Sequence, residues 1–426
     1  MIGKTPRTIS RREFVGGLGV GASGLLGLRL VTHAFAYDAA TPKGDAYVAR
    51  ALAPRTIAAA SVSNRVLVVI ELAGGNDGLS TLVPYGDVVY RSLRSATAIK
   101  PDEVIRMDDR FGLHPNLKLT APRLAIIQGI GAPDANQSHF EMSARWWNGD
   151  ASGHRNLGTG FLGRLCDVLD SGAPVTGVSL AGTSPALLSD KAVTMSVPSL
   201  DAMRWLHADD AWSSTFRRSF ADLAISPAGE PIPYVTARAG VGRALGFGAV
   251  LDNITPPSES EVASYPSSAL GAQLRLAAAI LGAGAGVRVV HVSMGGFDTH
   301  TNQRGSHDQL MIELDQALAA FAADIDKRNL TESVLVATTS EFGRRAKEND
   351  NGTDHGTASC ALLLGPVHPG VHGDPPSLSH LDEHDNLIAT ATLEEYYATL
   401  AQEWFGIDAA AVLPSTPRPI AAVLHV

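Results

Sequence analysis

The sequence predicts a three-layer αβα fold, in which helices cover both faces of a mostly parallel central sheet and a helical region is inserted. Five short apolar runs without polar alternation are typical of strands buried on both faces. Apolar residues at spacings of three and four predict a helix between two of these runs, which completes the βαβ order that a parallel sheet requires. The runs are residues 66–70, 124–129, 287–292, 334–337 and 360–364, and the helical stripe is Leu310, Leu314, Leu318, Phe321 and Ile325.

The first 36 residues predict a twin-arginine signal peptide. Arg11 and Arg12 precede a modest apolar stretch that reaches Leu30, and residues 34–36 offer a small-residue cleavage site. This pattern predicts export through the twin-arginine translocase to the periplasm or the exterior; a basic tail with an apolar helix is the alternative. Arg29 and many glycines make the stretch a poor permanent membrane span, and no other segment is long and apolar enough to cross a bilayer.

The remainder predicts an N-terminal arm and one large domain. Residues 37–60 are rich in alanine and proline and lack a pattern, so we interpret them as the arm. Residues 61–426 are expected to form the α/β domain, with a helical elaboration at about 185–266 and a linker around residues 255–258. A helix over residues 269–281 ends in a glycine run, but this run precedes a strand, whereas a dinucleotide-binding loop follows one.

Composition argues against two classes of partner and against a disulfide framework. The formal net charge is -9, and removal of residues 1–36, with five basic residues and one acidic residue, would make it about -13. An acidic surface argues against binding to nucleic acid or to anionic membranes. Cys166 and Cys360 form no Cys-x-x-Cys motif and are expected to be buried, unreactive thiols; a disulfide in an oxidising compartment is the alternative.

Carboxylate and imidazole side chains follow the predicted strand ends and predict a metal site. In sheets of this kind, ligands bind outside the carboxyl ends of the strands. Oxygen and nitrogen ligands suit a divalent cation. Asp298 and His300 lie two residues apart, so in an extended segment both side chains point the same way; a turn with a solvated histidine is the alternative. The candidate ligands are Asp77, Asp298, His300, Glu341, Asp354 and His355.

The other candidate ligands also have structural alternatives. Asp77 is suited to a turn or a helix cap, and Glu341 can pair with Arg344, three residues further along the chain. His355 is expected to bind the metal, and Asp354 either to bind it or to orient a ligand. An incidental histidine in a surface loop is the alternative for His355.

Ser138 is the candidate nucleophile. It follows a predicted strand and begins a helix, where free backbone N–H groups favour a developing anion. Ser138 and Glu141 also match a capping box, which requires no catalysis. On the same helical turn, His139 can help to bind an anion. The arginines that can neutralise an anionic group are Arg145, Arg344 and Arg345.

Several segments in order resemble one bacterial family. The twin-arginine leader is followed by ELAGGNDGLSTLVPY, NQSHFEMSARWWNG, MGGFDTHTNQ, TTSEFGR and GTDHGTASCALLLGPV. Together they resemble the family called domain of unknown function 1501, over roughly residues 65–406. That family is placed by distant similarity near the alkaline phosphatase and sulfatase superfamily, so the resemblance implies an alkaline phosphatase-like fold.

The resemblance also implies a site. It places a metal site and a nucleophile on five residues: Asp77, Ser138, Asp298, His300 and His355. Glu341 matches the position where the superfamily usually has an Asp-His pair, and Phe342 stands where the histidine is expected, so a second metal site is poorer in this chain. Residues 390–392 also depart from the acidic-aromatic-arginine triplet expected of the family.

Residues and resemblance together predict an exported, metal-dependent hydrolase of a small anionic ester, either a phosphate or a sulfate. One or two divalent cations, of zinc, calcium, manganese or magnesium, would polarise the ester oxygen and lower the pKa of a bound water or of Ser138. The alternative is a non-catalytic periplasmic binding or assembly protein on the same scaffold. A serine esterase is a third class, but residues 291–295 lack the first glycine of a nucleophile elbow.

Overall fold

The computed structural model describes residues 64–425 except 156, 201–210, 226–228, 253 and 255–257. The predicted signal peptide, the arm and most of the predicted linker lie outside these residues. Among the helices that are described, none combines the length and apolar character needed to cross a membrane.

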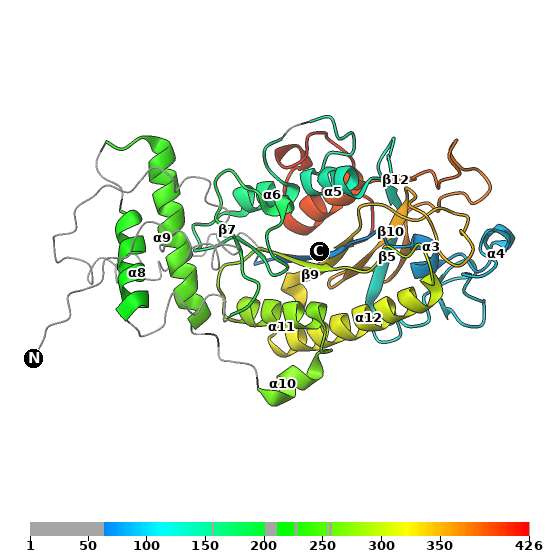
Figure 1. Ribbon diagram of the computed structural model, residues 1–426, viewed down its shortest axis with the longest axis horizontal. Coiled ribbons are helices and arrows are strands. Elements are labelled where there is room, and N and C mark those ends of the chain that lie inside the picture. The colour runs from blue at the N-terminus through cyan, green and yellow to red at the C-terminus, as the bar shows by residue number, and fades with distance from the viewer. Residues whose placement is uncertain are drawn as a thin grey trace, which may run out of the picture.

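A mixed, mostly parallel sheet forms the centre of the described structure (Figure 1). Its strands are β1 (Val66–Leu72), β5 (Leu124–Gly131), β6 (Gly177–Ser179), β7 (Thr194–Ser196), β8 (Val289–Met294), β9 (Val334–Thr339), β10 (Ser359–Leu364), β11 (Gly370–His372) and β12 (Ala391–Thr392). They follow the order β11-β5-β10-β9-β1-β8-β6-β7, and β12 also pairs with β5. β8 and β9 run parallel to β1, whereas β10 is antiparallel to both of its neighbours.

Each face of the sheet carries its own hydrophobic core, because alternate side chains of the buried central strands point to opposite faces. One core lies against α11 (Ala269–Gly282) and α12 (Gln303–Lys327). The other lies against α5 (His139–Asn148), α6 (Phe161–Leu169) and α13 (Leu393–Ala398). Figure 1 shows these two sets of helices on opposite sides of the sheet. The predicted three-layer fold class is therefore confirmed.

The remaining elements are short or lie at the margins of the sheet. The stretch that was expected to be helical contains α8 (Ala211–Leu223), α9 (Ile232–Asp252) and α10 (Glu259–Ser264), but it also contributes the edge strand β7. A small separate sheet consists of β2 (Leu82–Val83), β3 (Ile105–Arg106) and β4 (Gly112–Leu113). The short helical segments are α3 (Gly78–Thr81), α4 (Val88–Leu93), η3 (Ala121–Arg123), η4 (Pro185–Leu187), η5 (Thr331–Ser333), the π-helical η6 (Thr399–Trp404) and η7 (Ala409–Ala411).

The strand directions bring four loops to one edge of the sheet. β1, β8 and β9 are parallel, so the loops that follow them leave at the same edge. Because β10 runs antiparallel to β9, the loop that precedes β10 lies at this edge as well. Gly74 lets two of these loops touch: its φ is +118°, and a Cβ there would overlap the backbone nitrogen of Asp298.

Both cysteines are free and buried, Cys166 in α6 and Cys360 in β10. Burial raises the pKa of both thiols, that of Cys360 to about 12. The thiols therefore stay protonated and unreactive, as predicted, and the disulfide alternative is not formed.

Candidate metal centre

Five of the six predicted ligands lie in one cluster at this edge of the sheet. Contacts between side chains run without a break from Glu341 through His139 to Asp298, and from there to the residues of the last loop. The cluster contains Asp298, His300, Glu341, Asp354 and His355, together with His139, which sequence reasoning had considered only for anion binding. The structure does not place Asp77 in it.

Three imidazoles turn the same ring nitrogen toward Asp298. The Nε2 atoms of His300 and His355 lie 3.1 Å and 3.0 Å from Asp298 Oδ1. These two nitrogens are 3.0 Å from each other. His139 Nε2 lies 3.7 Å from Asp298 Oδ2.

The other nitrogen of each ring is held by a group that only accepts hydrogen bonds. Carboxylate and carbonyl oxygens have no hydrogen to donate, so Nδ1 is the donor in each of these pairs, and a ring with its single proton at Nδ1 presents a lone pair at Nε2. Metal-ligating histidines are usually oriented in this way. The pairs are His139 with Glu341 Oε1 at 2.8 Å, His300 with Asp354 Oδ1 at 3.1 Å, and His355 with the backbone carbonyl of Gln137 at 2.9 Å.

The resulting cluster of acceptor atoms fits a cation. Lone pairs at 3.0–3.1 Å repel one another unless a positive charge or a proton lies between them. A tetrahedral zinc with bonds of about 2.0–2.1 Å separates its ligand atoms by roughly 3.3 Å, close to these distances. His139, Asp298 and His355 also offer ligand atoms that all lie within 4.8 Å of one another. Three imidazoles and one carboxylate suit zinc or another transition metal better than calcium or magnesium.

Arg344 holds the carboxylate of Asp298 through a hydrogen bond. Partial burial raises the pKa of Asp298, but the hydrogen bond and the charge of Arg344 outweigh this effect and lower it to about 2. The guanidinium of Arg344 is fully buried, donates to Asp298 Oδ1 at 2.7 Å, and also donates to carbonyl oxygens of Gly74, Gly75, Phe297 and Thr353. We therefore replace the predicted anion-binding role of Arg344 with a structural one, because it joins the loops and holds Asp298.

Arg145 is occupied in a similar way. It is buried, donates to the carbonyl oxygens of Pro133 and Ala151, and pairs with Glu141 at 2.6 Å. Because Glu141 is committed to Arg145, it does not complete the capping box that the sequence suggested. Ser138 occupies the N-cap position of α5, but its side chain makes no capping hydrogen bond. The hydroxyl of Ser138 is half-buried, lies next to His139 in the sequence, and is not used to cap the helix.

Asp77 has a different environment from the cluster. Its carboxylate accepts hydrogen bonds from Arg94 at 2.6 Å and 3.2 Å, from Ser80 at 2.7 Å, from Leu79 N at 3.2 Å, and from the amide of Gln303. Burial raises the pKa of Asp77, but the charge and hydrogen bonds of Arg94 hold it well below its ordinary value. With its lone pairs used by the protein, Asp77 is an ion-pair partner and the cap of α3. We do not retain it as a metal ligand.

Glu341 and Asp354 lie behind the imidazoles instead of facing the common point. Glu341 Oε1 accepts from Gly74 N and from His139, both at 2.8 Å. Partial burial raises the pKa of Asp354, but hydrogen bonds from His300 and Asn349 outweigh this effect and lower it. Both carboxylates therefore hold imidazole rings, and for Asp354 this contact matches the second of the two roles considered for it.

Phe342 supports two of the imidazoles. It is buried, and its ring centroid lies 4.9 Å from that of His139 and 4.6 Å from that of His355. The residue at which the resemblance implied a histidine thus contributes packing to the cluster.

Gln137 holds its carbonyl toward His355 in an uncommon backbone conformation. Its φ is +61°, a left-handed value that residues other than glycine rarely adopt. Its side-chain amide donates to Asn386 Oδ1 at 3.0 Å. No sequence pattern linked residue 137 to residue 355, and strain of this kind is typical of functional sites.

Comparison with known families supports the predicted resemblance. Residues 254–411 match the family model described as "Protein of unknown function (DUF1501)". The predicted resemblance to this family is therefore confirmed over these residues. The matched DUF1501 segment contains five of the cluster residues, and His139 lies ahead of it. No curated protein matches the chain in sequence.

Solved structures with a similar fold include a sulfatase, a phosphatase and a synthase. The sulfatase PsFucS1 from Pseudoalteromonas sp. is 10% identical, with 89% of this chain and 78% of that chain covered and a TM-score of 0.39. A mutant of the alkaline phosphatase PafA is 10% identical over 86% and 100%, with a TM-score of 0.42. The lipoteichoic acid synthase LtaP from Listeria monocytogenes is 9% identical over 88% and 81%, with a TM-score of 0.39. At these identities and scores the likeness assigns neither an activity nor a residue role to this chain.

Proposed function

We propose that the protein is a metal-dependent hydrolase of a phosphate or sulfate ester. The observation that carries the proposal is the convergence of three imidazole Nε2 atoms on Asp298, with each ring fixed at Nδ1 by an acceptor. A bound divalent cation supplies positive charge that polarises an ester oxygen.

The residues of the chain have separate tasks in this proposal. His139, His300, His355 and Asp298 hold the cation, and Ser138 is the nucleophile or a hydrogen-bond donor to the substrate. Two features support Ser138: its hydroxyl is not used for capping, and it precedes ligand His139 at the N-terminus of the ten-residue α5. The cluster is open to substrate, since the side chains of Asp298 and His300 are 48% and 42% exposed.

Arg345 is the remaining arginine for the anionic group of the ester. Unlike Arg145 and Arg344, it is only partly buried. Its backbone N–H donates to the carbonyl oxygen of Asp354 at 3.1 Å, so Arg345 lies next to the cluster. Replacing Arg345 with Ala should raise KM for an anionic ester more than it lowers kcat, because the interaction is made with bound substrate.

Metal analysis and ester hydrolysis test the proposal together. We expect the purified protein to bind a divalent cation and to hydrolyse an aryl phosphate or sulfate, and a chelator to abolish the turnover. Asp298→Asn should lower metal affinity by about tenfold or more. Glu383→Gln, which changes an 87% exposed carboxylate, is the matched control and should bind metal normally.

Each negative outcome has a distinct meaning. If the folded protein neither contains nor takes up a divalent cation, the proposal is wrong. If it binds a cation in the cluster but hydrolyses no ester across a broad panel, the non-catalytic binding role is the better explanation.

We further propose that the protein is exported through the twin-arginine translocase to the periplasm or beyond. Arg11 and Arg12 ahead of the apolar stretch support this proposal. The double variant Arg11→Lys, Arg12→Lys should remain in the cytoplasm, as measured by cell fractionation, whereas Lys4→Arg should be exported normally. Export of the double variant at the normal level would contradict it.

A further inference from the structure

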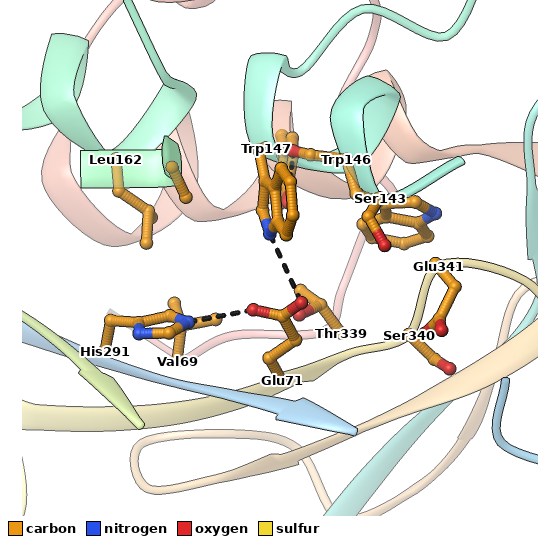
Figure 2. A pocket seen from close by; sticks show the side chains of 12 residues that line it. Val69, Glu71, Ser143, Trp146, Trp147, Leu162, His291, Thr339, Ser340 and Glu341 are labelled. Atoms are coloured by element: carbon orange, nitrogen blue, oxygen red, sulfur yellow. Dashed lines mark hydrogen bonds and ion pairs between the residues drawn. The ribbon is translucent and has the colours of Figure 1, made fainter. Parts of the chain in front are cut away.

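A small buried chamber lies directly behind the cluster (Figure 2). In Figure 2 its upper wall is α5, with Ser143, Trp146 and Trp147, and Glu71 and His291 lie below on the sheet. Glu341, which holds ligand His139 through Oε1, also lines it. Its volume of about 10 Å³ is close to the smallest space that accommodates one water molecule.

Two atoms of opposite hydrogen-bonding character, carried by residues that line this chamber, have no partner among the described groups. Glu341 Oε2 is a buried acceptor, and Trp146 Nε1 is a buried donor. Buried polar atoms of this kind are almost always paired with protein or with ordered water, because leaving them unpaired is costly. The neighbouring Trp147 is already paired, since its Nε1 donates to Glu71 Oε1 at 3.2 Å.

We propose that the chamber binds one structural water molecule, which accepts a hydrogen bond from Trp146 Nε1 and donates one to Glu341 Oε2. A buried water makes about three hydrogen bonds. The hydroxyls of Ser143 and Thr339 and the carboxylate of Glu71, which line the same chamber, provide an acceptor for its second hydrogen.

This water makes Trp146 a positioning residue for the metal centre, an inference that rests on the proposed metal-binding function. Glu341 Oε1 already accepts from Gly74 N and His139. With Oε2 also bound, the carboxylate cannot rotate, and His139 is held with Nε2 directed at Asp298. Such partners behind a ligand typically contribute tenfold or more to metal affinity.

The two adjacent tryptophans provide a matched test. Trp146→Phe removes the donor to the water, whereas Trp147→Phe removes an indole N–H of the same chamber that serves Glu71 instead. In high-resolution crystal structures we expect the water in the wild-type protein and in Trp147→Phe, and not in Trp146→Phe. We expect the Zn²⁺ affinity of folded Trp146→Phe, measured by chelator competition, to fall about tenfold, with Trp147→Phe near the wild-type value.

A third variant guards against misfolding of Trp146→Phe. Ser143→Val fills the chamber while both hydrogen-bond partners of Glu341 Oε1 remain, so it should expel the water and cause a similar loss of Zn²⁺ affinity. The Nδ1–H proton of His139, observed by NMR in the metal-free protein, should shift in Ser143→Val and Trp146→Phe but not in Trp147→Phe.

The inference and the proposed function fail in different ways. A dry chamber in the wild-type crystal structure overturns the inference, and so do wild-type Zn²⁺ affinities in both Ser143→Val and Trp146→Phe. If the wild-type protein binds neither Zn²⁺ nor any other divalent cation, the proposed function and the positioning role both fail, while the crystal structure still decides whether the water is present.

Discussion

Asp77 and Asp298 show how burial and partners separate two aspartates with similar sequence contexts. Each follows an apolar strand and a Gly-Gly pair. Asp77 is 1% exposed and is neutralised by the buried guanidinium of Arg94. Asp298 is 48% exposed and has lone pairs directed at three imidazoles. The first aspartate therefore serves stability, and the second is suited to bind a cation.

Exchanging either aspartate for asparagine should separate these two roles. Asp77→Asn leaves the charge of Arg94 buried without a counterion, so we expect a loss of about 3–5 kcal/mol in the free energy of unfolding and normal metal binding by the folded fraction. Asp298→Asn should weaken metal binding with a much smaller loss of stability. Urea denaturation and metal titration on both variants measure this, and equal destabilisation of the two would contradict the assignment.

The left-handed conformation of Gln137 also has a measurable consequence. A β-branched residue strongly disfavours positive φ, so Gln137→Val should turn the carbonyl away from His355 and lower Zn²⁺ affinity by about tenfold. Gln137→Gly permits the same φ and keeps the carbonyl, so it should retain most of the affinity. If the valine variant binds as tightly as the glycine variant, the carbonyl does not orient His355.

Individual residues mark the limit of prediction from the sequence. The carboxylates and imidazoles after the strands were found because parallel strands deliver their loops to one edge. His139 was not identified as a ligand, because its orienting partner Glu341 is 202 positions away and no local spacing encodes that contact. Arg94, 17 positions after Asp77, likewise gives no signal of the ion pair that removes Asp77 from the site.

At the scale of elements, α12 links the sheet to the loops beneath the cluster. It carries buried Gln303, His307 and Asp315, whose side chains contact Asp77, Asn76 and the backbone near Thr120. Burial lowers the pKa of His307 to about 3. Burial also lowers the pKa of His114, against an opposing effect of Asp308 on α12, to about 4. Near neutral pH both rings are therefore uncharged in the folded protein.

These two histidines predict that acid destabilises the fold. Below the ordinary histidine pKa of about 6.5, both histidines are protonated in the unfolded chain but not in the folded protein. Their contribution to the free energy of unfolding is therefore fully present above pH 6.5 and decreases as the pH falls toward about 3. Each histidine contributes a slope of up to about 1.4 kcal/mol per pH unit. His307→Gln should reduce the slope between pH 6 and pH 4.5 in urea titrations, and an unchanged slope would contradict the assignment.

Strands and helices could be predicted where neighbouring residues of the sequence form a recognisable pattern. Apolar runs without alternation identified β1, β5, β8, β9 and β10, and the helical stripe identified α12. The antiparallel direction of β10 was not apparent, because a buried strand has the same composition in either direction. This direction brings the loop with His355 to the edge of the sheet where the cluster lies. The position of His355 therefore depends on the sheet topology, which the strand propensity of the residues does not reveal.

At the scale of the whole molecule, the cluster ties metal binding to stability. A cation that binds only the folded chain raises the free energy of unfolding by about 2.7 kcal/mol when its free concentration is 100 times Kd. Wild-type protein should therefore melt at a higher temperature with Zn²⁺ than with chelator in differential scanning fluorimetry. Asp298→Asn should show little shift, and an equal shift in both proteins would indicate that Zn²⁺ binds elsewhere.

The dispersed origin of the ligands also sets an order of events in the cell. His139 comes from the start of α5 and His355 from the loop before β10, so the proposed site is incomplete until the sheet that carries these elements has formed. Twin-arginine transport carries chains that are already folded. A chain exported in that way would meet the cytoplasmic pool of metals first, and the availability of ions at the place of folding, as much as the chemistry of the ligands, would decide which ion it carries outside.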